Sequence, residues 1–376
     1  MPVSLTAETT DKKRIRTTQG TQRNLPTQAA SLSFADNDYL GLSRHPQVTE
    51  AAVCALHKSG TGARAARHLA GPCPEHARLE MDLAAWKKTG AALVFSSGYQ
   101  TPLGVIPSLV GSKDTVLLER NAHACLFDGT RLSGARLRLF TRNDPASLEE
   151  ALASARKLNP GGRILLVAES LHSMDGDFAD LQMLTLLKKK FGAWLLLDEA
   201  HANGGIGPEG SGWAAAQGLS DEVEIQMGTL GKALGSSGGF VAASAVVIDH
   251  FLNEARTFLF ATAPAPAAMA AATEALRILR SAEGETLRRR LQENIRLYLA
   301  LNPGPHPGPI QIRILRSNQA VIAARDFLHA GGIEVAAIRP PTVPEGTARL
   351  RISLSCRHSE EEIRRLAGAL SRLPNA

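Results

Sequence analysis

The chain has 376 residues, of which 44% are hydrophobic and 21% are charged. This composition is typical of a globular protein and excludes a disordered, fibrous or low-complexity chain. The formal net charge is +6, but the basic runs are short and lie in helical patterns. That distribution favours solvated helix faces over nucleic-acid binding, and it still suits an anionic substrate.

The cysteines and the N-terminal residues indicate in which cellular compartment the protein is expected. Four cysteines are widely spaced without a C-x-x-C pair, so the sequence indicates neither a disulfide framework nor a zinc cluster. We therefore expect a cytoplasmic protein without a metal. No apolar run approaches the roughly 18 residues of a membrane span, so we expect no membrane association. Residues 1–30 are polar and lack apolar periodicity, which predicts an N-terminal arm without a leading helix, ordered only against another surface.

From residue 31, apolar strand-like runs alternate with helical patterns. The predicted strands are 92–95, 115–118, 137–140, 164–168, 194–197 and 240–243. Such alternation indicates an α/β fold with a mainly parallel central sheet and helices on both faces. The runs 164–167 and 195–197 are apolar throughout, so we place them at the centre of the sheet.

The proline-rich stretch 263–266 predicts a boundary, because proline cannot donate a backbone hydrogen bond. Beyond it, the apolar spacing predicts helices that include 287–299 and 363–373, with strands over 310–315 and 349–354. These elements form a smaller C-terminal α+β domain. The expected organisation is an arm over 1–30, a large domain over 31–262 and a small domain over 263–376.

In open α/β sheets, ligands bind beyond the carboxyl ends of the strands. Polar or glycine-rich clusters lie in or beside five of the runs: Gly98 and Tyr99; Glu119 and His123; Glu169 and Ser173; Asp198 and His201; and Gly228–Gly239 with Lys232. Taken singly, each cluster has a plain explanation as a turn or as a satisfied polar residue.

Three of these residues together indicate pyridoxal phosphate. Lys232 is flanked by small residues, Asp198 ends a buried strand, and His123 follows another strand. Pyridoxal phosphate needs an amine for its Schiff base, an anion beside its ring nitrogen, and donors for its phosphate. The conjunction of residues, rather than any one of them, carries the prediction.

Five segments resemble the α-oxoamine synthases, which are pyridoxal phosphate enzymes of fold type I. They are 37–42 (NDYLGL), 173–177 (SMDGD), 198–201 (DEAH), 229–232 (TLGK) and 337–344 (AIRPPTVP). The resemblance runs in order from about residue 31 to residue 373. It implies the transferase fold of type I and a homodimer with active sites at its interface.

The resemblance also implies a role for each matching residue. Lys232 would form the Schiff base and later transfer protons, Asp198 would pair with the ring nitrogen, and His123 would stack on the ring. The implied contacts to the ring hydroxyl are Ser173 and His201, and those to the phosphate are Gly98, Tyr99, Thr229 and, from the other subunit, Thr262.

On the substrate side, the resemblance implies that Arg351 holds the amino-acid carboxylate, because a guanidinium matches that group bidentately. Arg349 lies two residues earlier on the same strand face, so the assignment between them stays open. Asn37 is also an implied substrate contact. Four residues depart from the family pattern. They are Ala122 where asparagine is common, Cys125 where serine is common, Asn203 where threonine is common, and Arg64 where small residues are usual.

The implied reaction is the decarboxylative condensation of an amino acid with an acyl thioester, carried on coenzyme A or on a carrier protein. Residues 337–353 most resemble the biotin-pathway member of the family, which uses L-alanine and a pimeloyl thioester. Other members, which use glycine or serine with a different acyl chain, are the alternative.

Two motifs also fit other enzyme classes. Residues 198–201 spell a helicase motif, but Lys232 is followed by Ala233 instead of the serine or threonine of a phosphate loop. Residues 235–239 fit the G-x-S-x-G pattern of a hydrolase with Ser237 as nucleophile, but they run into a strand instead of opening a helix. A scaffold without chemistry is disfavoured, because Lys232 and Asp198 are both present.

Overall fold

The computed structural model describes residues 4–25, 30–69, 73–304 and 306–373. The chain forms two compact units: unit 1 comprises residues 1–36, 174–176 and 293–376, and unit 2 comprises residues 37–173 and 177–292. The division falls within α12 (Ala282–Leu301) instead of after residue 262, because α11 (Pro266–Leu279) packs against helices of unit 2. The extents of the independently folding domains stay a prediction.

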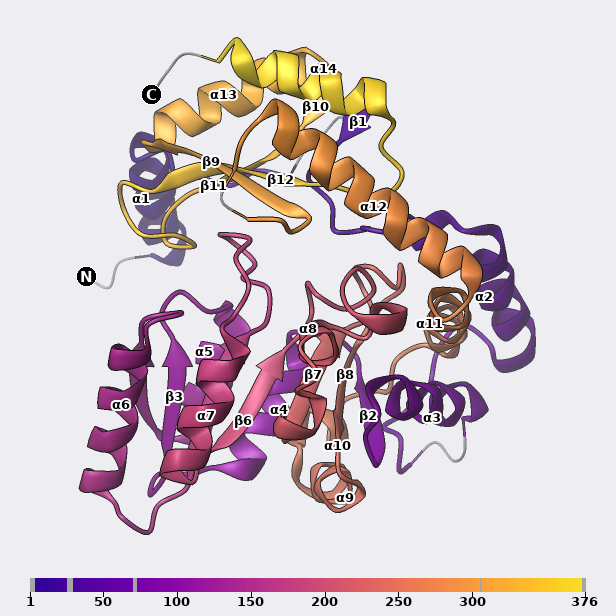
Figure 1. The fold of residues 1–376 in the computed structure, drawn as a ribbon, viewed down its shortest axis with the longest axis vertical. Helices are drawn as coiled ribbons and strands as arrows, with labels where there is room; N and C mark the ends of the chain where they lie inside the picture. The colour runs from indigo at the N-terminus through magenta and orange to yellow at the C-terminus, as the bar shows by residue number, and fades with distance from the viewer. Residues whose placement is uncertain (1–3, 26–29, 70–72, 305, 374–376) are drawn as a thin grey trace. The chain divides into compact units, whose positions relative to one another are not determined.

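Unit 2 is built around a mixed, mostly parallel sheet (Figure 1). Its strands are β2 (Ala91–Phe95), β3 (Thr115–Glu119), β4 (Arg136–Phe140), β5 (Ile164–Glu169), β6 (Trp194–Asp198), β7 (Ile225–Thr229) and β8 (Gly239–Ala243). They lie in the order β2-β8-β7-β6-β5-β3-β4, and β8 runs antiparallel to both neighbours. The predicted central runs are β5 and β6, and both positions are confirmed.

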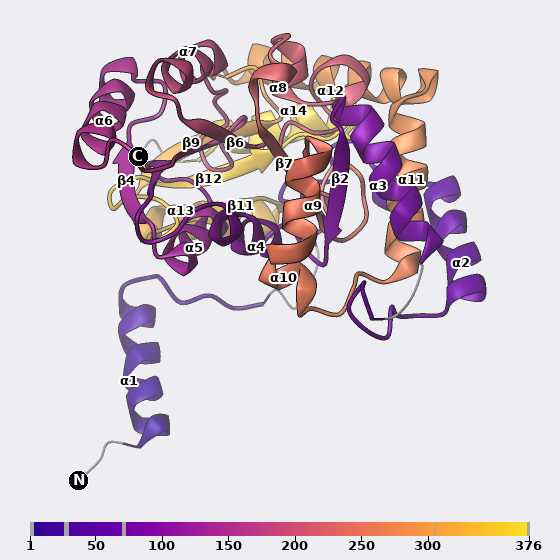
Figure 2. The same ribbon diagram turned by 90° about the horizontal axis from the view of Figure 1, so that it is seen from below.

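Helices cover both faces of this sheet (Figure 2). One face packs against α4 (Gln100–Leu109), α5 (Ala124–Ser133), α9 (Ala245–Glu254) and α10 (Arg256–Leu259). The other packs against α6 (Pro145–Leu158), α7 (Leu181–Phe191) and α8 (Trp213–Ala216). Successive side chains of a strand point to opposite faces, so Leu196 enters one core while Leu195 and Leu197 enter the other. This explains why the central strands are apolar throughout.

A third group of helices covers the β2 edge of unit 2. It consists of α2 (Pro46–Ser59), α3 (Pro74–Lys87) and α11, with α3 packed against β2 and α11 packed against both other helices. Proline occupies the first position of each helix, where its missing N–H costs no hydrogen bond.

The sequence missed β7, the strand that leads into Lys232. Gln226 and Gly228 interrupt its apolar run, and Gln226 is buried inside the sheet. The other runs predicted for this sheet match strands to within about two residues, which is the usual uncertainty of element ends.

Unit 1 contains the antiparallel sheet β11-β12-β9, formed by β9 (Ile310–Arg316), β11 (Ala336–Ile338) and β12 (Ala348–Ser353). Helix α13 (Asn318–Ala330) packs on it, and α14 (Glu360–Ser371) begins at Ser359, which forms a capping box with Glu362. A short parallel pair joins β1 (Leu32–Ser33) to β10 (Ile333–Glu334). The smaller α+β region is therefore confirmed as a separate sheet.

The expectation of an N-terminal arm without a helix is wrong for residues 5–18, which form α1 (Leu5–Thr18). Ser4 caps the helix by accepting a hydrogen bond from the Ala7 N–H, and Lys12 pairs with Glu8 one turn earlier. None of its residues is buried, so apolar periodicity gave no signal. The rest of the predicted arm includes residues 1–3 and 26–29, which lie outside the described residues.

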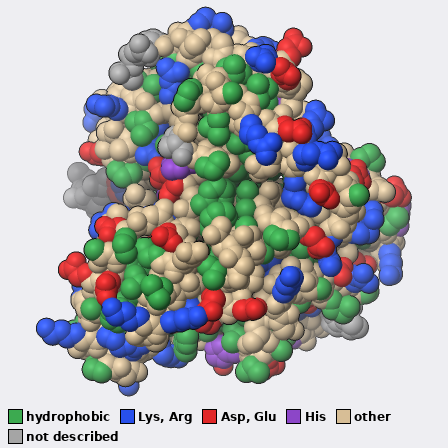
Figure 3. Space-filling view, viewed as in Figure 1, with side chains coloured by type: hydrophobic (Ala, Val, Ile, Leu, Met, Phe, Trp, Pro, Cys, Tyr) green, Lys and Arg blue, Asp and Glu red, His purple; other side chains and the backbone are tan. Residues whose placement is uncertain are grey.

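The surface carries mixed charge. On the face shown in Figure 3, Lys and Arg side chains are interspersed with Asp and Glu. None of the described helices combines the length and apolar character needed to cross a bilayer.

Candidate active site

A cavity of about 160 Å³ lies within unit 2, lined by residues at or after the carboxyl ends of β2, β3, β5, β6 and β7. Its lining includes the predicted residues Gly98, Tyr99, His123, Ser173, Asp198, His201, Thr229 and Lys232. Residues that the sequence did not assign to a role also border it: Cys125, Glu169, Ala200, Met227 and Gly228. The fold thus gathers segments that are far apart in the chain.

Asp198 is the last residue of the central strand β6, and it pairs in register with Glu169 at the end of β5. Its side chain is buried, and Oδ1 accepts a hydrogen bond of 2.9 Å from the Ala200 N–H. Burial raises the pKa of Asp198 to about 7; Glu169 adds to this rise, and Lys232 opposes it. The cavity therefore contains a carboxylate that lacks full charge compensation.

Lys232 lies in the turn between β7 and β8. Its Nζ is 2.7 Å from Nε2 of His201, and Nδ1 of that imidazole is 2.7 Å from the Tyr39 hydroxyl. Tyr39 in turn donates to Oδ1 of Asn37 over 3.2 Å. A continuous chain of hydrogen bonds therefore connects Lys232 to Asn37.

His123 occupies the N-cap of α5, directly beyond β3. Its Nδ1 accepts from the Cys125 N–H at 3.3 Å and lies 2.9 Å from Sγ of the same cysteine. The Tyr99 ring meets the imidazole edge-on, with 6.2 Å between the centroids. Burial lowers the pKa of His123, so its ring favours the neutral form.

Glu169 holds two parts of the cavity wall in place, a role that the sequence analysis missed. One carboxylate oxygen accepts from the His123 N–H at 2.6 Å, and the other accepts from the Ser173 N–H at 3.1 Å. The available signal was the one that identified Asp198, an acid that ends an apolar strand.

Glu119 and Arg142 form hydrogen bonds to the backbone of Glu169. The Glu169 N–H donates to Glu119, and Nη1 of Arg142 donates to the Glu169 carbonyl and to both oxygens of Glu119. Burial raises the pKa of Glu119 to about 7, whereas the charge of Arg142 opposes that rise. Arg142 therefore holds the end of β5 in place, whereas Lys232 lines the cavity.

Gly98 and Thr229 approach each other closely at the wall of the cavity. A Cβ atom on Gly98 would lie 3.1 Å from both Cβ and Oγ1 of Thr229, tighter than most such contacts. The Thr229 hydroxyl donates to the Gly238 carbonyl and accepts from the Gly231 N–H. Glycine at position 98 therefore lets the backbone reach the threonine.

Some predicted residues do not line this cavity. Thr262 is exposed, and its carbonyl accepts from the Ser96 hydroxyl at 2.8 Å. Arg349 and Arg351 belong to β12 of unit 1, where both are buried. Arg349 pairs with Asp175 of the same unit, while Nη1 of Arg351 donates to the Ser353 hydroxyl at 2.9 Å.

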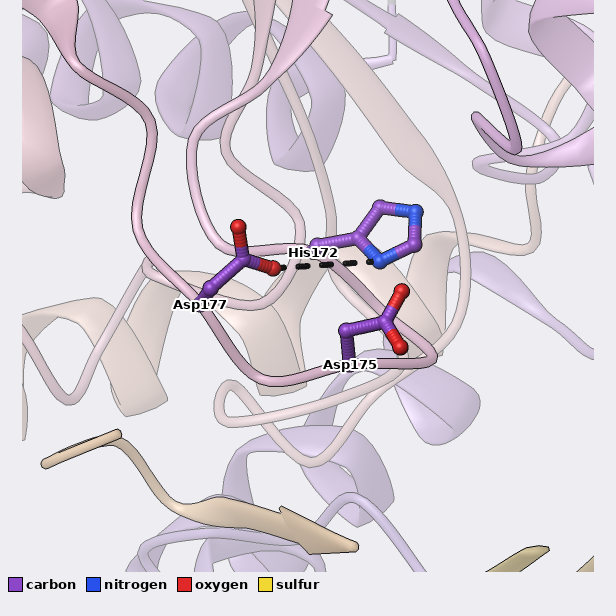
Figure 4. Close-up of side chains that lie close together, drawn as sticks. All are labelled: His172, Asp175 and Asp177. Carbon is purple, nitrogen blue, oxygen red and sulfur yellow. Dashed lines mark ion pairs between the residues drawn. The ribbon is translucent and has the colours of Figure 1, made fainter. Parts of the chain in front are cut away.

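A group of acidic residues and a histidine lies near the end of β5 (Figure 4). His172 Nδ1 and Asp177 Oδ1 are 4.0 Å apart, and the other oxygen of Asp177 accepts from Nε of Arg142 at 2.7 Å. Asp175 pairs with Arg349. Because each carboxylate already pairs with a guanidinium, we assign no metal to this group.

The fold and the comparisons together define a pyridoxal-phosphate-dependent enzyme of fold type I. A sequence model described as aminotransferase class I and II matches residues 30–370, and the chain belongs to that family. The resemblance to the α-oxoamine synthases is confirmed by the named relatives, and the chain is an acyl-transferring enzyme.

Two curated relatives illustrate the similarity. The 8-amino-7-oxononanoate synthase of Geobacter sulfurreducens is 41% identical over 374 residues, covering 94% of this chain and 95% of that protein. The enzyme of the same name from Alkalilimnicola ehrlichii is 44% identical over 350 residues, covering 90% of this chain and 87% of its own length.

Solved structures agree. A serine palmitoyltransferase from S. paucimobilis, with a bound PLP–myriocin aldimine, is 28% identical with a TM-score of 0.89, covering 98% of this chain and 97% of that one. The 8-amino-7-oxononanoate synthase of Francisella tularensis is 25% identical with a TM-score of 0.77, and the coverage is 91% and 97%.

Proposed function

We propose that this chain condenses L-alanine with a pimeloyl thioester, releasing the thiol and carbon dioxide and giving the 8-amino-7-oxononanoate of biotin biosynthesis. The curated relatives that bear the corresponding name support the substrate pair. The observation that carries the chemistry is the cavity lined together by Lys232, Asp198 and His123, which lie at or beyond the carboxyl ends of β7, β6 and β3.

Pyridoxal phosphate supplies an aldehyde that bonds to amines and a protonated ring that takes up the electrons of a carbanion. Lys232 would hold the aldehyde, Asp198 the ring nitrogen, and His123 one face of the ring. The remaining contacts follow the predicted assignment: Ser173 and His201 to the ring hydroxyl, and Gly98, Tyr99 and Thr229 to the phosphate.

Two features of the cavity fit this cofactor. The buried carboxylate of Asp198 is disfavoured unless a cation neutralises it, and a protonated ring nitrogen is such a cation. The close approach of Gly98 to Thr229 brings backbone and a hydroxyl together without an intervening side chain, as a phosphate requires.

Lys232 also acts as the base of the reaction in this proposal. Its Nζ accepts the α-proton of the amino acid and returns a proton at the end of the cycle. His201, at 2.7 Å from Nζ, can exchange a proton with it directly. Asp198 would keep a negative charge beside the ring nitrogen, and this charge would lower the barrier to proton removal.

We assign the amino-acid carboxylate to Arg351 instead of Arg349. The Arg349 guanidinium is engaged by Asp175, and it also donates to the carbonyls of Met174 and Thr347. Releasing it would break the ion pair between Arg349 and Asp175. Asn37 is assigned to the substrate as well, and its side chain is joined to the cavity through Tyr39.

The hydrolase alternative is disfavoured by the position of Ser237. This serine lies in the turn between β7 and β8, and the segment continues directly into β8. A nucleophile elbow instead connects a strand to a helix, whose N-terminus helps to stabilise the oxyanion. The arrangement around Ser237 therefore does not match that of a hydrolase.

The active form in this proposal is a cytoplasmic homodimer in which Thr262 of each protomer contacts the cofactor phosphate of the other. The exposure of Thr262 outside the cavity of its own unit supports this assignment. Mixing Lys232→Ala and Thr262→Val chains tests it, because a mixed dimer contains one site with both native residues. Recovered turnover is expected, and its absence would contradict the shared site.

The substrates are tested by incubating the protein with alanine, glycine or serine and with acyl thioesters of several chain lengths. Each acyl group is supplied on both coenzyme A and a carrier protein, and products are weighed by mass spectrometry. We expect the alanine and pimeloyl pair to react fastest. Faster reaction of glycine with a succinyl thioester, or of serine with a long-chain one, would contradict the biotin assignment.

A further inference from the structure

A second cavity, of about 320 Å³, lies within unit 2 and has no part in the reaction described so far. It is larger than the cavity around Lys232. Its lining includes three cations, Lys58, Arg64 and Arg67, and one acid, Glu75. The charged side chains described at this cavity are therefore mainly cationic, which suits an anionic ligand.

Two of the three cations are not engaged by an acid. Arg67 forms a bidentate pair with Glu80, with N···O distances of 2.8 and 3.0 Å, so its charge is already compensated. Within the described part of the chain, by contrast, neither the Lys58 nor the Arg64 side chain forms an ion pair or a hydrogen bond. Both side chains are exposed and can therefore turn to a ligand.

Glu75 is the acid of this cavity, and neighbouring donors hold its carboxylate. It accepts from the Ser59 hydroxyl at 2.8 Å and from the Cys73 thiol at 3.3 Å. Burial raises the pKa of Glu75, but hydrogen bonds from its own N–H, Ser59 and Cys73, together with the charge of Lys58, bring it below the ordinary value. This one negative charge offsets one cation, so an excess of positive charge remains.

His76 adds a neutral acceptor to the wall of the cavity. Its buried ring places Nε2 2.9 Å from the Pro264 carbonyl, which can only accept, so Nε2 carries the proton. Burial lowers the pKa of His76 to about 4, and the ring is neutral at pH 7. Nδ1 has no hydrogen-bond partner among the described residues. A ligand with an N–H group as well as an anion would satisfy it.

Arg64 adopts a backbone conformation that favours glycine. Its φ is +69°, in the left-handed region that a side chain with a Cβ atom disfavours. It also stands where the family pattern usually has small residues. Strained residues of this kind are concentrated at ligand sites, where the function of the side chain outweighs the backbone preference.

The segment that follows Thr262 connects this cavity to the proposed active site. Ala263 lines the cavity, and its N–H donates to the carbonyl of Ala65, next to Arg64, at 3.1 Å. In the proposed function, Thr262 contacts the cofactor phosphate of the other protomer. The cavity therefore adjoins the active site to which Thr262 contributes.

We propose that this cavity binds an anionic group of the acyl thioester, with Arg64 as the main ligand of that group and Lys58 as a second one. The inference rests on the proposed function and deepens it, because it gives the second substrate a site. A pimeloyl thioester offers two such groups, the free carboxylate of the acyl chain and a phosphate of coenzyme A or of the carrier arm. A guanidinium fork matches either of them.

The test compares thioesters that keep or lack each anion, with alanine as the amino acid. Pimeloyl-coenzyme A has both anions, heptanoyl-coenzyme A lacks the carboxylate, pimeloyl-N-acetylcysteamine lacks the phosphates, and heptanoyl-N-acetylcysteamine lacks both. Arg64→Gly removes the cation and suits the left-handed backbone, so the variant should fold. We expect its kcat/KM to fall roughly tenfold with pimeloyl-coenzyme A, as for the loss of one charge-assisted hydrogen bond, and to stay unchanged with the substrate that lacks both anions.

The substrate on which the effect of Arg64→Gly disappears identifies the bound group. Its disappearance with heptanoyl-coenzyme A assigns the cavity to the carboxylate, and its disappearance with pimeloyl-N-acetylcysteamine assigns the cavity to a phosphate. An equal loss with all four substrates would overturn the proposal, because Arg64 would then act without an anion. Arg64→Lys keeps a cation and should retain most of the wild-type kcat/KM.

Lys88→Gly is the matched control. Lys88 is also an exposed cation with a positive φ, of +54°, and it is not among the residues that line the cavity. Its replacement should leave kcat/KM at the wild-type value with every substrate. Lys58→Ala should give a smaller loss than Arg64→Gly, about threefold, with the same dependence on substrate.

Binding without turnover separates this inference from the proposed function. Calorimetry measures the affinity of the pyridoxal-phosphate-loaded protein for pimelate and for coenzyme A. If the wild type condenses alanine with none of the thioesters, the proposed function fails and binding decides: weaker binding of either anion to Arg64→Gly than to Lys88→Gly supports the site, and equal binding of both overturns it. If the wild type forms product but Arg64→Gly behaves like Lys88→Gly, the inference fails alone.

Discussion

Asp198 and Glu199 are neighbours in the sequence but belong to different kinds of charge cluster. Glu199 is fully buried in an ion pair with Lys87, whose ammonium also donates to the Asn203 side chain and the Ser211 carbonyl. Asp198 borders the cavity, with Glu169 as a neighbouring acid and only partial compensation from Lys232.

The difference separates structural charge from functional charge. The Lys87–Glu199 cluster is complete: its charges cancel, and the other oxygen of Glu199 accepts from the Ala214 N–H. No net charge of this pair is left for a ligand to neutralise. The cavity cluster is incomplete: the described residues that line the cavity include two acids, Asp198 and Glu169, and one lysine, so a bound cation would stabilise it.

The largest effect on this comparison is expected from removing Lys232, the lysine of the cavity cluster. Lys232→Ala should lower turnover by roughly 10⁴-fold, because the chain loses both its covalent attachment point and its base. The visible absorbance of the loaded protein should disappear as well. Lys113→Ala, at an exposed lysine, is the control. A borohydride-stable link to cofactor in the Lys232 variant would contradict the assignment.

Removing Lys87, the cation of the complete cluster, should instead lower the stability of the protein. Lys87→Met leaves Glu199 buried without its partner, and we expect the free energy of unfolding to fall by about 3–5 kcal/mol. The double variant Lys87→Met with Glu199→Gln should recover most of that loss, because no uncompensated charge remains. Urea unfolding of both proteins checks this; equal stability of the single and double variants would refute it.

Asp198→Asn tests the cavity cluster through the pH dependence of protein stability. The folded-state pKa of Asp198, about 7, lies above the ordinary aspartate value of 3.8. The cofactor-free native state therefore binds this proton more tightly than the unfolded state does. The contribution of Asp198 to stability is present below pH 4 and is lost as the pH rises toward 7.

The variant lacks this loss, because asparagine carries no charge to bury. Relative to Asp198→Asn, the cofactor-free wild type should become less stable between pH 4 and pH 8, by at most about 4 kcal/mol. Urea unfolding of both proteins across this range measures the difference. A difference that is independent of pH would show that Asp198 does not titrate there.

The smallest effect concerns Cys125, whose thiol is within 2.9 Å of the His123 imidazole. Cys125→Ala removes that contact, and we expect the affinity for pyridoxal phosphate to fall about fivefold, since a net hydrogen bond contributes roughly 1 kcal/mol. Cys125→Ser keeps a donor and should retain the wild-type affinity. An absorbance titration compares them, with Cys54→Ala as an exposed control. Equal affinities in all of them would exclude a role for the thiol.

The parts of the site that follow apolar strands could be predicted from sequence. Asp198 and His123 each come shortly after a continuous apolar run, and such runs are strong signals for buried parallel strands. The sequence missed β7, the strand before Lys232, because Gln226 and Gly228 break its pattern. There, neighbouring strands impose the extended conformation, which a single-segment pattern cannot reveal.

Contacts between distant segments could not be predicted in the same way. Tyr39 and His201 are 162 positions apart, and their hydrogen bond depends on how the turn after β6 folds back. Glu169 shows the same limit: its place at a strand end was visible, but its bonds to two backbone amides were not. Helix α1 was not predicted, because none of its residues is buried and it therefore has no apolar periodicity. Its cap and side-chain pairs are the local features that specify it.

Unit 1 is assembled from both ends of the chain, with β1 near the N-terminus paired to β10 near the C-terminus. During synthesis, all of unit 2 emerges between these two strands. At about 5–20 residues per second, residues 293–376 follow on the order of ten seconds after unit 2 has been made. β1 stays unpaired until β10 emerges within that interval, so a nascent chain holds an unpaired strand while its catalytic sheet is already able to fold.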